Sequence, residues 1–78
     1  MDVEKIRALR LADPFKPFKL VMSDGRVLPV ERAVFLGIAP DGRRLAYAMA
    51  EGGFDFLPVE SVADAVIDEQ MLWHWRAR

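Results

Sequence analysis

The chain has 78 residues, of which 53% are hydrophobic and 29% are charged, and its formal net charge at pH 7 is −1. A chain of this length supports one domain and buries only about 60% of its unfolded surface, so we expect a thin stability margin that self-association would improve. The low net charge argues against non-specific duplex binding, and the absence of cysteine excludes disulfides and thiolate metal sites. With no export signal and no apolar run of membrane-spanning length, we expect a cytoplasmic protein.

Charge is distributed unevenly along the chain. The first 19 residues hold five basic residues against three acidic ones, whereas residues 51–70 hold six acidic residues and no basic one. Ordinary solvated side chains account for this pattern. The alternative is head-to-tail contact between identical subunits, in which the basic surface of one meets the acidic surface of the next.

The first predicted element is a helix over residues 2–12. Asp2 can accept a hydrogen bond from the free backbone amides of a first turn. Apolar side chains then recur at helical spacing, at Val3, Ile6, Ala8 and Leu9. Pro14 disfavours helical geometry at Asp13, so the helix is expected to end there.

From Phe18 the hydrophobic pattern alternates, which predicts strands. Phe18, Leu20 and Met22 share one face of the first strand, which we expect to be buried. Asp24-Gly25 supplies the positive backbone angle of a tight hairpin, and residues 26–30 return as the partner strand. This hairpin begins a β meander.

The remaining segments continue the meander. Residues 33–39 are predicted as a buried segment that extends the return, and residues 43–50, 54–57 and 62–67 as the third, fourth and fifth strands, with a corner at 58–61. In the third strand Ala46, Ala48 and Ala50 share a face, and such small side chains would let a neighbouring layer approach closely.

The predicted fold class is mainly β with an N-terminal α-helix. We expect a small five-stranded, bent antiparallel sheet or barrel over residues 18–67, within a single domain over residues 1–67. Closure into a barrel would remove exposed strand edges, and an open sheet covered by the helix is the alternative.

The order of helix, strand, Asp-Gly hairpin, bent return, two further strands and a short corner resembles the Sm-like (Hfq-like) small β-barrel, a relative in shape of the SH3-like barrel. The resemblance covers residues 3–67. Its best matching residues are 18–26, which are similar to the strand and turn of the family's first motif, with Phe35 where that motif often has an aromatic residue.

The sequence departs from the Sm-like pattern at other positions. Val30 and Leu36 stand where the family has a second glycine and an acidic residue, and residues 57–62 lack the Arg-Gly or Lys-His pair that helps contact RNA. The resemblance therefore implies topology and carries over no RNA-binding residue. The chain also resembles short uncharacterised bacterial proteins with a Pro-Phe-x-Pro-Phe element followed by Asp-Gly-Arg, a resemblance that implies no known activity.

Candidate catalytic and metal-binding groups are sparse. His74 is the only histidine, and neither Ser23 nor Ser61 has a plausible base. The glycines are spread over turns and a strand and form no phosphate-binding loop. We expect no enzyme activity, no catalytic residue, no metal and no cofactor.

The C-terminal segment 68–78 contains both tryptophans of the chain. We interpret it as an aromatic tail that can be helical, and its candidate interface residues are Met71, Leu72, Trp73 and Trp75. Three interpretations are open. The rings pack on their own domain, they anchor another subunit or partner, or they stack on bases.

The leading hypothesis is a non-enzymatic, self-associating small β-barrel module that acts through protein–protein contacts, as a homo-oligomer or with another protein, and with no membrane partner. The alternative is an Sm-like RNA-binding protein that uses the basic N-terminal helix and the tail aromatics. Its candidate RNA contacts are Lys5, Arg7, Arg10, Arg76 and Arg78.

Overall fold

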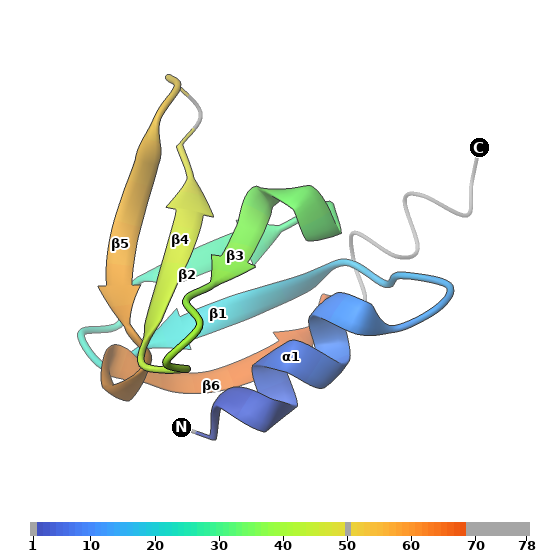
Figure 1. Ribbon diagram of the computed structural model, residues 1–78, viewed down its shortest axis with the longest axis horizontal. Helices are drawn as coiled ribbons and strands as arrows, with labels where there is room; N and C mark the ends of the chain where they lie inside the picture. The colour runs from blue at the N-terminus through green and yellow to red at the C-terminus, as the bar shows by residue number, and fades with distance from the viewer. Residues whose placement is uncertain (1, 50, 69–78) are drawn as a thin grey trace.

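The computed structural model describes residues 2–49 and 51–68, which form one α-helix and six strands in two sheets (Figure 1). The helix is α1 (Val3–Leu11), and the strands are β1 (Phe18–Met22), β2 (Val27–Val30), β3 (Leu36–Ile38), β4 (Arg44–Ala48), β5 (Phe54–Pro58) and β6 (Val62–Ile67). Two single-turn 3₁₀-helices, η1 (Ala33–Phe35) and η2 (Val59–Ser61), connect β2 to β3 and β5 to β6. The predicted class, mainly β with an N-terminal helix, is confirmed.

The helix α1 begins at the predicted cap. The Asp2 carboxylate accepts a hydrogen bond from the backbone N–H of Glu4 at 2.9 Å, which satisfies one of the free amides of the first turn. Ile6 is completely buried, and Val3 and Leu9 on the same face pack against the core. In the part of the chain that the structure describes, no helix is long and apolar enough to span a membrane.

The strands form two antiparallel sheets of three. One has the order β2-β1-β6 and the other the order β3-β4-β5. In β1 the burial alternates along the strand, with Phe18, Leu20 and Met22 inside as predicted. The core lies between the two sheets and α1, and consists of Ile6, Phe18, Leu20, Met22, Val30, Leu36, Leu45, Leu57, Val59, Val62 and Ala65.

The five-stranded prediction is wrong at the bent return. Residues 33–39 do not form one buried strand, because the 3₁₀ turn η1 ends β2 and only residues 36–38 continue as β3. Each half pairs with a different sheet, β2 with β1 and β3 with β4. A short apolar run does not by itself distinguish a buried strand from a helical turn, and Val34 within this run is largely exposed.

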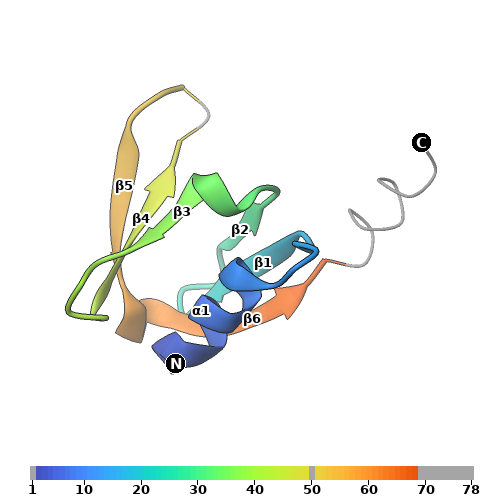
Figure 2. The same ribbon diagram turned by 45° about the vertical axis from the view of Figure 1, so that its right-hand side comes forward.

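Barrel closure is likewise not what the structure shows. The described strands divide into two separate ladders, and the β4–β5 hairpin projects away from the sheet β2-β1-β6 (Figure 1, Figure 2). The chain crosses between the sheets only through short connections such as η1 and η2. In place of the single predicted sheet or barrel, the structure has two open sheets, with α1 packed against the core.

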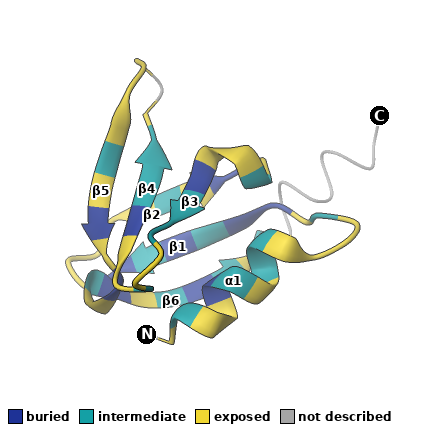
Figure 3. Cartoon of the chain, in the orientation of Figure 1, coloured by how far each residue is buried: buried dark blue, intermediate teal, exposed yellow. Residues whose placement is uncertain are grey.

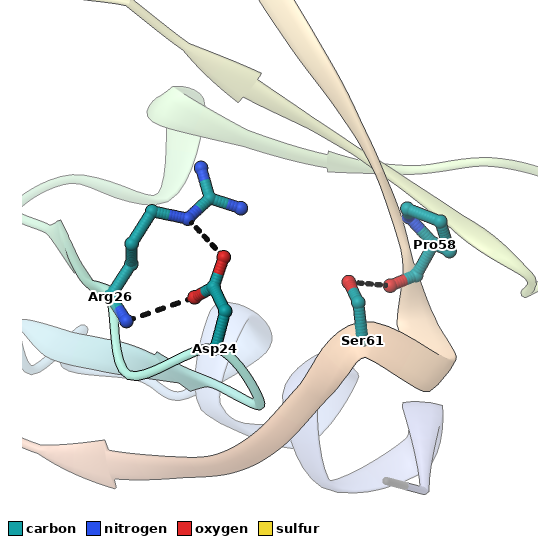
Figure 4. A network of polar contacts seen from close by, with 4 residues as sticks. All are labelled: Asp24, Arg26, Pro58 and Ser61. Atoms are coloured by element: carbon teal, nitrogen blue, oxygen red, sulfur yellow. Dashed lines mark hydrogen bonds and ion pairs between the residues drawn. The ribbon is translucent and has the colours of Figure 1, made fainter.

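Two corners confirm the predicted turns (Figure 4). In the β1–β2 hairpin the Asp24 carboxylate accepts hydrogen bonds from the backbone N–H and the Nε of Arg26, at 3.0 and 2.8 Å, and Gly25 has a φ of 95°. At η2 the Ser61 hydroxyl donates to the carbonyl of Pro58 at 2.7 Å. Ser61 is thus the corner residue that the sequence predicted.

Candidate functional site

The sheet β3-β4-β5 has an exposed aromatic edge. Phe54 and Phe56 on β5 are 59% and 69% exposed, and β5 is largely exposed apart from its end near η2 (Figure 3). Because side chains alternate between the faces of a strand, both rings stand on the face opposite the buried Leu57. The two phenylalanines of β5 therefore point toward solvent, whereas Leu57 points into the core.

The neighbours of these rings across the sheet are small. Phe56 lies in register with Ala46 of β4, which in turn pairs with Gly37 of β3, and Phe54 lies in register with Ala48. We call these five residues the outer apolar face. Among these five residues only the phenylalanines have large side chains, so they form a ridge along β5 above the small residues of β3 and β4. A hollow of about 410 Å³ lies over Gly37 and Ala46 beside Phe56, and the exposed Arg44 also lines it.

Part of the outer apolar face could be predicted from the sequence. The small side chains of β4 indicated that a layer could approach this face, and the alternation in β5 was visible. The pattern did not show which of the two faces of β5 lies against the core, because Leu57 and the phenylalanines are all apolar and occupy opposite faces.

A second hollow, of about 640 Å³, lies between β2 and the β4–β5 hairpin. We call it the inter-sheet groove. Its apolar and aromatic side chains are Leu28, Pro29, Phe35, Tyr47, Ala48 and Met49, and its charged ones are Arg26, Glu31, Glu51 and Asp55. The Tyr47 hydroxyl donates a hydrogen bond to the carbonyl of Pro29 at 2.7 Å and so ties β4 to β2.

The inter-sheet groove has an acidic character. Three carboxylates and one arginine, Arg26, line it, and Arg26 is already paired with Asp24, whose pKa is lowered chiefly by the backbone hydrogen bond from Arg26. Burial raises the pKa of Tyr47, and the negative charge of Glu31 raises it further. The field inside the groove therefore favours a cationic occupant.

Three of the five basic residues predicted to contact RNA, Lys5, Arg7 and Arg10, lie on α1, and each of the three interacts within the chain. Lys5 forms an ion pair of 3.0 Å with Asp64 on β6, and this hydrogen bond is the main reason that the pKa of Asp64 is lowered. Arg7 pairs with Glu4, and the Nε of Arg10 donates to the carbonyl of Leu36. The remaining candidates, Met71, Leu72, Trp73, Trp75, Arg76 and Arg78, lie outside the described residues, as does His74.

Within the ranges 2–49 and 51–68, no group of three His, Cys, Asp or Glu residues could hold a metal ion. Ser23 and Ser61 serve local backbone structure, since the Ser23 N–H donates to the carbonyl of Ser61 at 2.8 Å. We take the outer apolar face and the inter-sheet groove as the two candidate binding surfaces.

No family model, curated protein or solved structure matches the chain. The Sm-like interpretation accordingly stays a prediction from the order of the elements.

Proposed function

We propose that this chain is a non-enzymatic, self-associating module that acts through protein–protein contacts, with the outer apolar face as its contact surface. The observation that carries the proposal is the pair of exposed phenylalanines, Phe54 and Phe56, above a floor of small residues. Contiguous exposed apolar patches on small domains mark interaction sites, and aromatic residues are enriched at the centres of interfaces.

The shape of the outer apolar face suits a second copy of itself. A two-fold axis parallel to the strands would place β5 of each copy over β3 and β4 of the other. The ridge of Phe54 and Phe56 would then fill the low region over Gly37, Ala46 and Ala48 of its partner. Such a contact is isologous and closed, and it corresponds to two sheets packed face to face about 10 Å apart.

The topology also supports a relationship to the Sm-like and SH3-like barrels. Two three-stranded sheets linked through a bent β2–β3 segment and a short 3₁₀ corner follow the order of elements on which that resemblance rests. We infer a cytoplasmic setting from the absence of cysteine, which suits a reducing compartment.

RNA binding is the less favoured function. Its three described candidates on α1 all engage neighbouring groups, so phosphate binding would compete with contacts to Asp64, Glu4 and the carbonyl of Leu36. A titration with single-stranded RNA at low salt addresses this alternative directly. Tight binding there would favour RNA over protein contacts.

The test of the proposed function is the Phe56→Lys variant, measured by light scattering after size exclusion at two protein concentrations. Wild-type protein should have a mass above the 8.9 kDa of one chain, and Phe56→Lys should have the mass of a monomer. The reason is that a buried unpaired charge at an interface is strongly unfavourable.

The matched control is Leu11→Lys, which adds the same charge at a residue that is 65% exposed at the end of α1. It should retain the wild-type mass. A wild-type chain that is monomeric at both concentrations, or a Phe56→Lys chain with unchanged mass, contradicts the proposal.

A further inference from the structure

The inter-sheet groove combines an apolar wall with acidic groups, which is the chemistry that binds an aromatic and basic peptide. Leu28, Phe35 and Tyr47 offer apolar and aromatic surface. Glu31 and Asp55 belong to its carboxylates, and Asp55 lies in register with Tyr47. Indole rings bury large area on such walls, and arginine binds both carboxylates and aromatic faces.

The C-terminal segment of this chain has the complementary composition. Residues 71–78 contain two tryptophans, a leucine, a methionine and two arginines, with no acidic residue. They begin four residues after Ile67, the last residue of β6, and no other stretch of the sequence contains a tryptophan. Charge and apolar character therefore match between this segment and the inter-sheet groove.

The segment also starts close to the groove. Phe18 of β1 pairs with Ile67 of β6 on one side and with Val30 of β2 on the other. The ends of β6 and β2 are thus two strand spacings apart, or about 10 Å. Glu31, which follows Val30, lines the groove.

The length of the segment is sufficient to cross this distance. The backbone N–H of Asp68 donates to the carbonyl of Pro17 at 3.0 Å, which fixes where the chain leaves the sheet. Residues 69–78 can span up to about 33 Å when extended. About a third of this length reaches the near end of the groove, and the rest can lie along it.

We propose that the inter-sheet groove is the docking site of the chain's own segment 71–78, with Trp73 and Trp75 against its apolar wall and Arg76 and Arg78 on its carboxylates. This inference goes beyond the proposed function and does not depend on it, because it concerns a different surface that shares only Ala48 with the outer apolar face. Docking in this way covers the acidic groove and leaves the outer apolar face free.

Intrinsic fluorescence of the full-length chain tests the docking, because Trp73 and Trp75 are its only tryptophans. The native emission should lie at shorter wavelength than that of the urea-unfolded chain, and acrylamide should quench it less. Glu31→Lys and Glu51→Lys each replace a carboxylate of the groove with a cation that repels the cationic segment, so each should shift the emission toward that of the unfolded chain and increase quenching.

The matched control is Glu60→Lys, the same charge change at an exposed residue outside the groove. It should leave emission and quenching as in the wild type, and circular dichroism should verify that all variants are folded. Phe56→Lys should also leave the emission unchanged, which separates this proposal from the proposed function.

Four results would overturn the docking. They are a native emission equal to that of the unfolded chain, an equal response to Glu31→Lys and Glu60→Lys, a shift produced by Phe56→Lys instead, and a native emission that reverts on dilution. The third would place the segment on the outer apolar face, and the last would place it on another copy.

Discussion

At the scale of single residues, Asp24 stabilises the β1–β2 hairpin through two hydrogen bonds from Arg26, one from its backbone and one from its side chain. The carboxylate accepts these bonds most strongly when it is ionised. They are local, joining residues two apart, and this is why the sequence alone predicted the turn correctly.

The β1–β2 hairpin makes the stability of the folded chain depend on pH. The pKa of Asp24 is lower in the folded chain than its ordinary value, chiefly because the Arg26 N–H binds the carboxylate. Its contribution to stability is therefore fully present above the unfolded pKa, near 4, and is lost as the pH falls through the folded pKa. We expect the urea concentration at the unfolding midpoint to be lower at pH 2.5 than at pH 7. In Asp24→Asn this difference should be smaller.

Comparison of the two pH values within each variant isolates this effect from any general loss of stability. Asp64, whose pKa is also lowered, contributes with the same sign, so the acid dependence of Asp24→Asn should be smaller but not zero. An unchanged acid dependence in Asp24→Asn would show that Asp24 contributes nothing to it.

At the scale of elements, α1 is held to the sheets by the buried Ile6, by the partly buried Val3 and Leu9, and by two polar contacts. Ile6 is fully buried, Lys5 pairs with Asp64 on β6, and Arg10 donates to the carbonyl of Leu36 on β3. Exposed ion pairs contribute little, so the apolar contact dominates. The ion pair of Lys5 with Asp64 also joins the basic N-terminal segment to the acidic C-terminal half of the same chain. Part of the uneven charge distribution is therefore neutralised within one subunit.

The weight of this apolar contact can be measured. Ile6→Ala should lower the free energy of unfolding by about 2–5 kcal/mol, the usual cost of removing a buried large aliphatic side chain. Leu11→Ala, on the same helix but 65% exposed, should change it by less than about 0.5 kcal/mol. Urea unfolding followed by circular dichroism gives both values, and equal losses in the two variants would mean that α1 is not docked through Ile6.

The elements differ in how well local sequence determines them. Alternation and turn residues predicted β1, the hairpin and the 58–61 corner, because these depend on neighbours in the chain. The 3₁₀ turn η1 was missed, since the choice between strand and turn at residues 33–35 depends on which sheet each half joins. The exposure of Phe56 was missed for the same kind of reason. It is set by the pairing of β5 with β4 and by the core position of Leu57.

At the scale of the whole molecule, the chain has a small core and two open sheets, and the outer apolar face lies on the sheet that projects from it (Figure 1). If two copies bury this face, unfolding is coupled to dissociation, and mass action makes the unfolding temperature rise with protein concentration. A monomer with a docked C-terminal segment unfolds at a temperature independent of concentration.

We therefore expect the unfolding temperature of the wild type to rise over a roughly hundredfold range of concentration, and that of Phe56→Lys to stay constant. Glu31→Lys should keep the wild-type concentration dependence, because the inter-sheet groove is not part of the self-contact. Differential scanning calorimetry with matched scan rates measures all three. A rise that persists in Phe56→Lys but disappears in Glu31→Lys would move the self-contact from the outer apolar face to the groove, and would make the C-terminal segment the element that joins the copies.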